Sequence, residues 1–183
     1  MAEQKPEQGL AVVTGGAGDI GSAIAMELAS DGWDLVLLDV RDQEVGSAKA
    51  AEISAATGST VDYREVDQCD QEQMNNLVRS MPGLSLMVIT AATVKAQPFL
   101  EIELEHWKNQ IDLNLTGSFI AAQAAAKSMR SNGVKGQIIF ISSWVASRPW
   151  PEITAYTASK AGVEQLMRQL ALELAADGIR ANA

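Results

Sequence analysis

Residues 10–21 read LAVVTGGAGDIG, and this stretch decides the fold class. It opens with an apolar run of strand length, and a helical pattern begins at Ile20. Between them Gly16, Gly18 and Gly21 have the spacing G-x-G-x-x-G, which has meaning when a strand precedes it and a helix follows. Glycines there let the backbone turn tightly and approach a pyrophosphate resting on the helix start. A plain tight turn is the alternative, but the context favours cofactor binding.

The ligand predicted for this turn is a dinucleotide. A nucleoside-triphosphate loop is excluded, because Gly21 is followed by Ser22-Ala23 and not by Lys and Ser or Thr. The residues that we expect to contact the cofactor here are Gly15, Gly18, Asp19, Ile20 and Gly21.

Asp39, at the end of the next apolar run, indicates which dinucleotide binds. A carboxylate there can accept hydrogen bonds from both ribose hydroxyls of NAD, and it would repel the 2′-phosphate of NADP. Arg41 lies nearby, and an arginine there could tolerate that phosphate. If Asp39 has no function, it is simply a solvated carboxylate at the end of a strand. We therefore predict NAD as the cofactor and regard NADP as the alternative.

Apolar runs of strand length alternate with longer helical patterns along the rest of the chain. We expect strands at 10–14, 34–39, 59–66, 84–90 and 137–142, and a sixth beginning within 178–183. We expect helices at 20–30, 42–56, 71–81, 104–130 and 154–176. Unbroken Val, Ile and Leu strands flanked by helices indicate a parallel sheet covered on both faces. Right-handed crossovers then give an α/β fold with a doubly wound parallel sheet, whose ligands bind beyond the carboxyl ends of the strands.

Size and composition limit the classes of protein to consider. The 183 residues suit one domain, at 10–183, after a polar tail at 1–9 that we expect to be flexible. A net charge of −9 disfavours nucleic acid as a partner. The single cysteine, Cys69, permits no internal disulfide and indicates the cytoplasm, and with one histidine it predicts no metal site. The most apolar stretch, 120–129, is interrupted by polar residues, so we expect no membrane span.

Tyr156 and Lys160 begin the last expected helix, and their spacing puts the phenol and the ammonium on one face. A nearby ammonium and the positive nicotinamide ring of oxidised cofactor both favour the phenolate, which suits Tyr156 to general acid/base transfer with an alcohol or carbonyl oxygen. Ser143 follows the fifth strand, where its hydroxyl can hold the same substrate oxygen. A hydrolase is disfavoured, because no G-x-S-x-G elbow exists to activate a serine and His106 lies in a polar segment.

These residues resemble the short-chain dehydrogenase/reductase superfamily, specifically its short single-domain branch with a Rossmann fold. The resemblance runs from Leu10 to the end of the chain and includes the glycine turn. Its further matches are Asp39, Asp67 after the third strand, Asn114 in IDLNLTGSF, Ser142-Ser143, Tyr156 with Lys160, and the ending GIRAN at 178–182.

The resemblance implies a role for each catalytic residue. Tyr156 would be the proton donor or acceptor, Lys160 would bind the nicotinamide ribose and bias Tyr156, and Ser143 would polarise the carbonyl. Asn114 would hold a water in a proton relay to Lys160, and Asp67 would contact the adenine amino group. Taken alone, Asn114 would be a polar residue that bends a helix and Asp67 a carboxylate in a turn.

The sequence departs from the short branch at two places near the cofactor. Asp19 stands where that branch has glycine, and its carboxylate would repel a pyrophosphate unless it points away, for example by capping the helix. Thr90-Ala91-Ala92-Thr93 replaces the usual Asn-Asn-Ala-Gly, and we expect Ala91 and Ala92 at the cofactor. Both departures lean towards the extended branch, so a nucleotide-sugar epimerase or dehydratase stays an alternative.

The family continues past Asn182 with a substrate lid and a last strand, so the resemblance implies that this chain is a fragment with both missing. We expect an oxidoreductase that moves a hydride between NAD(H) and a small alcohol or carbonyl substrate, assembled as a homodimer or homotetramer when complete. Phe99, Trp144 and Trp150 lie on loops near the expected pocket, but surface packing explains them equally well. A non-catalytic NAD-binding or interaction protein is the other alternative.

Overall fold

The computed structural model describes residues 9–183. The predicted flexible tail lies outside the described residues, apart from Gly9. The strands are β1 Leu10–Thr14, β2 Asp34–Asp39, β3 Val61–Glu65, β4 Leu84–Ile89, β5 Gln137–Phe140 and β6 Arg180–Asn182. The α-helices are α1 Asp19–Ser30, α2 Gln43–Thr57, α3 Gln71–Arg79, α4 Leu104–Ile111, α5 Ser118–Ser131 and α6 Thr154–Glu173. Four short helical segments, η1 Phe99–Glu101, η2 Asp112–Gly117, η3 Trp144–Ala146 and η4 Ala175–Asp177, complete the fold.

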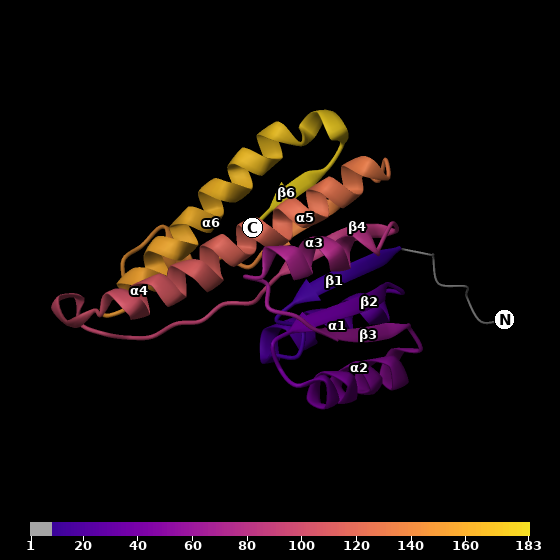
Figure 1. Ribbon diagram of the computed structural model, residues 1–183, viewed down its shortest axis with the longest axis horizontal. Coiled ribbons are helices and arrows are strands. Elements are labelled where there is room, and N and C mark those ends of the chain that lie inside the picture. Colours follow the sequence, from indigo (N-terminus) through magenta and orange to yellow (C-terminus); the bar gives the residue numbers. More distant parts are fainter. Residues whose placement is uncertain (1–8) are drawn as a thin grey trace.

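The six strands form one parallel sheet in the order β3-β2-β1-β4-β5-β6 (Figure 1). The order reverses at β1, because the chain builds outwards from β1 to β3 and then returns to the other side of β1 with β4. The predicted doubly wound fold is confirmed. Ligands of such sheets bind where the order reverses, outside the carboxyl ends of the strands.

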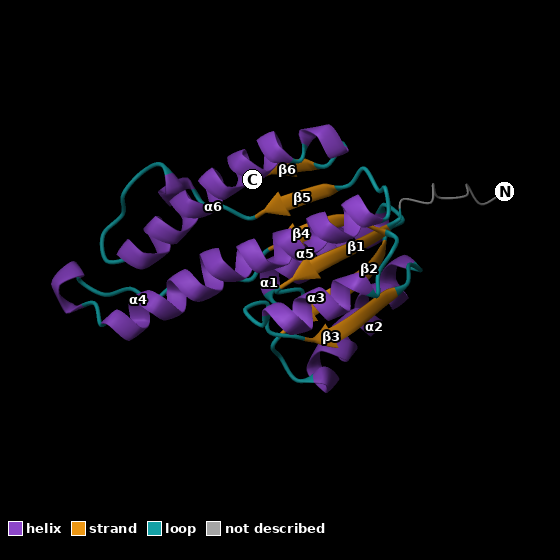
Figure 2. Cartoon of the chain, turned by 45° about the horizontal axis from the view of Figure 1, so that its top comes forward, coloured by secondary structure: helices purple, strands orange, loops and turns teal. Residues whose placement is uncertain are grey.

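Side chains of successive strand residues point to opposite faces and enter two separate cores. In β1, Val12 packs with α3, α5 and α6, whereas Ala11 and Val13 pack with α1 and α2. Helices α3 and α5 lie in front of the strands in Figure 2. Both faces of the sheet are therefore covered, as the unbroken apolar strands predict.

The predicted helix at 104–130 contains an interruption that its periodicity does not show. The chain is α-helical to Ile111, π-helical over Asp112–Gly117 and α-helical again from Ser118. Because a π-helical turn adds a residue without ending the helix, the predicted helix at 104–130 is found, with a π-helical interruption that was not predicted. Figure 1 shows α4 and the first part of α6 extending side by side past the carboxyl ends of the strands.

Several alanines of α5 that would suit a subunit interface lie in the core of the chain. They are Ala121, Ala122, Ala124 and Ala125. Core packing accounts for them, so the oligomer stays a prediction. Within residues 9–183, none of the helices combines the length and the apolar character that a membrane crossing requires.

Candidate cofactor and active site

A cleft of about 400 Å³ opens at the carboxyl ends of β1, β2, β3 and β4. Its volume falls within the range of small-molecule and cofactor sites. Nine of the eleven residues predicted to contact the cofactor line this cleft, together with Arg41 and Gln68. The nine are Gly15, Gly18, Asp19, Ile20, Gly21, Asp39, Asp67, Ala91 and Ala92. The structure thus gathers in one space residues that the sequence places after four different strands.

The glycine turn requires glycine for steric reasons. Gly15 has a φ of +63°, and a Cβ on it would lie 3.0 Å from the backbone of Ala91. A Cβ on Gly21 would lie 2.1 Å from the Gly15 carbonyl oxygen, so no side chain fits between the turn and α1. A Cβ on Gly18 would meet only that same oxygen, at 3.2 Å, which leaves this edge of the cleft open beside the helix start.

The expectation that Asp19 caps the helix is wrong. The N-cap residue of α1 is Gly18, which has no side chain, and Asp19 is the first residue of the helix. The Asp19 side chain is exposed and lines the cleft. A carboxylate in the first turn of a helix interacts favourably with the partial positive charge there, which accounts for Asp19 as a helix residue but leaves its charge beside the predicted pyrophosphate position.

Asp39 is held by backbone amides on both of its carboxylate oxygens. Oδ2 accepts a hydrogen bond from the Ala17 amide at 3.1 Å, and Oδ1 accepts one from the Arg41 amide at 3.3 Å. The carboxylate therefore links the glycine turn to the turn after β2. Arg41 is exposed and lines the same cleft, so a negatively charged and a positively charged side chain both face the predicted ribose position.

Asn114 is fully buried in the π-helical segment and joins two other parts of the site. Its Oδ1 accepts from the Thr93 amide at 2.8 Å, and its Nδ2 donates to the Thr93 carbonyl at 2.8 Å and to Ser159 Oγ at 3.1 Å. Ser159 in turn donates to the Tyr156 carbonyl at 2.7 Å. One amide thus fixes the segment after β4 against the helix that carries Tyr156 and Lys160.

Lys160 is buried beside the end of β5. Its Nζ donates to the Ile141 carbonyl at 2.7 Å and lies 5.6 Å from the centroid of the Tyr156 ring. Burial lowers the pKa of Lys160 to about 8. An ammonium has three donors, so two N–H groups are left for a ligand after the bond to Ile141.

Residues 9–183 match the sequence pattern of the family described as short chain dehydrogenase. The chain belongs to the short-chain dehydrogenase family. L-2,3-butanediol dehydrogenase of Corynebacterium glutamicum is 31% identical over 95% of this chain and 69% of that protein. Glucose 1-dehydrogenase 2 of Bacillus subtilis is 33% identical over 94% of this chain and 69% of that protein.

Solved structures of other dehydrogenases have the same fold. Carveol dehydrogenase of Mycobacterium avium, in complex with NAD, superposes with a TM-score of 0.90 at 27% identity, covering 98% of this chain and 70% of that one. Sorbitol-6-phosphate 2-dehydrogenase of Erwinia amylovora gives a TM-score of 0.88 at 28% identity, covering 93% and 68%. The predicted family is confirmed, and with it the class of oxidoreductase.

In this short-chain dehydrogenase the four predicted catalytic residues lie outside the cofactor cleft. Ser143 caps η3, accepts a hydrogen bond from the Val145 amide at 3.4 Å, and lines a separate hollow between β5 and α6. Trp144 and Trp150 stack edge to face beside it, with centroids 5.4 Å apart. Asn114, Tyr156 and Lys160 lie in a polar cluster that is linked by the hydrogen bonds of Ser159 and by the approach of Lys160 to the Tyr156 ring. The structure therefore shows a cofactor cleft and an adjacent polar cluster, joined through the backbone of residues 91–93.

Gln68, which was not among the predicted site residues, ties the cleft to the π-helical segment. Its buried Nε2 donates to the Ala91 carbonyl at 3.3 Å and to the Leu113 carbonyl at 3.0 Å. The Oε1 atom is buried without a partner among residues 9–183. The neighbouring Asp67 accepts from the Cys69 amide at 2.8 Å. The signal in the sequence was a polar amide directly after Asp67, a few residues past the end of β3.

Proposed function

We propose that this chain binds NAD(H) and carries the proton-transfer residues of a dehydrogenase that interconverts an alcohol and a carbonyl compound. The observation that carries the proposal is the cleft in which the glycine turn and the Asp39 carboxylate face one space. A relative of the same fold is bound to NAD, and others are named for dehydrogenation of a diol and a sugar. All three likenesses support a small alcohol as substrate.

The cleft fits the adenosine and phosphate half of the cofactor. The open edge at Gly18 lies at the start of α1, where free backbone amides favour an anion without help from Lys or Arg. Asp39 would accept hydrogen bonds from the ribose hydroxyls and would repel a 2′-phosphate. Asp67 would contact the adenine amino group, and Ala91 and Ala92 would line the path towards the nicotinamide.

Bound NAD(H) would supply the acceptor or donor of the hydride. Two free N–H groups of Lys160 would bind the nicotinamide ribose, and its ammonium would favour the phenolate of Tyr156. Tyr156 would transfer the proton at the substrate oxygen, to which Ser143 would donate a hydrogen bond. Asn114 would hold the water of a relay towards Lys160.

A pair of titrations and one variant test the proposal. NADH and NADPH binding are followed by nucleotide fluorescence, and oxidation of butane-2,3-diol, glucose and carveol is followed in parallel. We expect tighter binding of NADH, and a fall in turnover of about 100-fold or more in Tyr156→Phe with unchanged NADH affinity. Unchanged turnover in Tyr156→Phe would remove the mechanism. Preference for NADPH would remove the role of Asp39. Binding without turnover of any of the three alcohols would favour the non-catalytic alternative.

A further inference from the structure

Tyr63 of β3 is buried behind the cofactor cleft and not in it. Only 2% of the residue is exposed, and it is absent from the residues that line the cleft within the described chain. Its ring packs directly on Gly46 of α2, where an added Cβ would lie 2.0 Å from the ring. The glycine in α2 therefore makes room for this one aromatic side chain.

The Tyr63 hydroxyl contacts the turn that follows β2. It donates to the carbonyl of Asp39, at 3.1 Å, and to the carbonyl of Arg41, so one hydrogen is shared between two acceptors. Burial, followed by the nearby Asp39 carboxylate, raises the pKa of Tyr63 to about 12. The phenol is consequently a donor over the whole range in which the protein would work.

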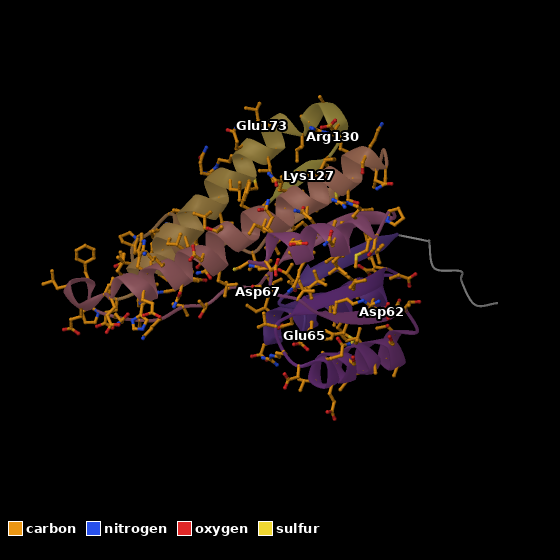
Figure 3. All side chains as sticks on the ribbon, viewed as in Figure 1. Asp62, Glu65, Asp67, Lys127, Arg130 and Glu173 are labelled. Carbon is orange, nitrogen blue, oxygen red and sulfur yellow. The ribbon has the colours of Figure 1, made fainter. Side chains whose placement is uncertain are left out.

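A second contact from β3 supports the same turn. The Glu65 carboxylate accepts a hydrogen bond from the Gln43 amide at 3.0 Å, at the start of α2. Figure 3 shows Glu65 and Asp67 towards the cleft end of β3 and Asp62 towards its other end. Residues 39–43 are thus held by hydrogen bonds from β3 on the side away from the cleft. The side chains of Asp39 and Arg41 line the cleft itself.

We infer that the Tyr63 hydroxyl is a positioning group that sets the preference for NAD over NADP. It holds the two carbonyls of the turn, so that the Arg41 amide stays on the Asp39 carboxylate and the acid keeps its place at the ribose. Without the hydroxyl the turn loosens. Asp39 then loses its fixed orientation, and with it the hydrogen bonds to the ribose hydroxyls that distinguish NAD from NADP. This inference rests on the proposed binding of NAD(H) by Asp39.

Tyr63→Phe tests the inference because it keeps the ring on Gly46 and removes only the hydroxyl. We expect the Kd for NADH to rise about three- to tenfold, the range for one lost hydrogen bond, and the Kd for NADPH to change by less than about twofold. The ratio of the two affinities is the decisive readout, because a merely structural defect would weaken both alike. Ser59→Ala is the matched control, since it removes a hydroxyl that donates to the Ala29 carbonyl at 2.7 Å near the opposite end of β3.

The outcomes separate this inference from the proposed function. Failure of the unaltered chain to bind NADH would contradict the proposed function. NADH binding with an unchanged affinity ratio in Tyr63→Phe would overturn the inference alone. If Tyr63→Phe does not fold, Glu65→Ala is compared with Glu65→Gln. Both remove the charge, but only Gln keeps an oxygen acceptor for the Gln43 amide, so we expect the lower NADH preference in Glu65→Ala. If Glu65→Ala and Glu65→Gln show the same ratio of NADH to NADPH affinity, the proposed effect of the turn on nucleotide preference is overturned.

Discussion

Replacing Lys160 by Met should change how the stability of the protein depends on pH. The side chain is 4% exposed, and burial lowers the pKa of its ammonium from 10.5 to about 8. In the unfolded chain the same group keeps its ordinary pKa. Between about pH 8 and pH 10.5 the unfolded chain therefore binds a proton that the folded chain has lost, and the free energy of unfolding rises with pH.

The size of this effect follows from the shift. Each pKa unit corresponds to about 1.4 kcal/mol, so integration from about pH 7 to about pH 10 gives a gain of about 2–3 kcal/mol for the unaltered protein. Lys160→Met has no such group. The difference in unfolding free energy between the two proteins should therefore move by about 2–3 kcal/mol in favour of the unaltered one as the pH rises.

Urea denaturation of both proteins, without nucleotide, at several pH values measures this difference directly. The exposed Lys127 of α5 provides the control, because Lys127→Met removes an ammonium that contacts only Gln123 in the described chain. The pH dependence that belongs to the buried site is the part that Lys160→Met shows and Lys127→Met does not. Equal pH dependence in the two variants would refute the reasoning, since burial of the Lys160 ammonium would then have no effect on its protonation.

Three further substitutions test other contacts of the site. Asn114→Ala should lower the unfolding free energy by about 2–4 kcal/mol, because it removes three hydrogen bonds of a fully buried amide; urea denaturation measures this loss. Gly21→Ala should weaken NADH binding at least tenfold, since its Cβ would lie 2.1 Å from the Gly15 carbonyl oxygen; NADH fluorescence would show unchanged affinity if the turn could yield. Gln68→Met keeps the length of the side chain but frees two carbonyls, so hydrogen exchange at residues 112–117 should become faster, and equal exchange would contradict the bridging role.

The arrangement of the sheet and of the cofactor cleft could be predicted from local patterns. Strand and helix periods differ, so the alternation of residues 10–142 shows which segments are strands and where each one ends. In a parallel sheet those ends meet at one edge. Gly15, Asp39, Asp67 and Ala91 therefore come together whatever the details of packing.

Contacts that depend on distant backbone groups could not be predicted in this way. The π-helical turn at 112–117 preserves the helical pattern of the sequence around it, so no local signal marks it. Gln68 finds its acceptors 23 and 45 positions further along the chain. Tyr63 looks like an ordinary strand aromatic until its ring is seen to fill the space left by Gly46.

The same distinction indicates where tuning of this dehydrogenase should occur. Residues of the glycine turn have almost no freedom, because any Cβ on Gly15 or Gly21 meets backbone. The carbonyls of the turn that carries Asp39 are held instead by Tyr63 of β3, which does not line the cleft, so a substitution there leaves the lining residues in place. The inference about Tyr63 therefore predicts that selectivity between two nucleotides that differ by one phosphate changes through such supporting contacts, without altering the residues proposed to touch the cofactor.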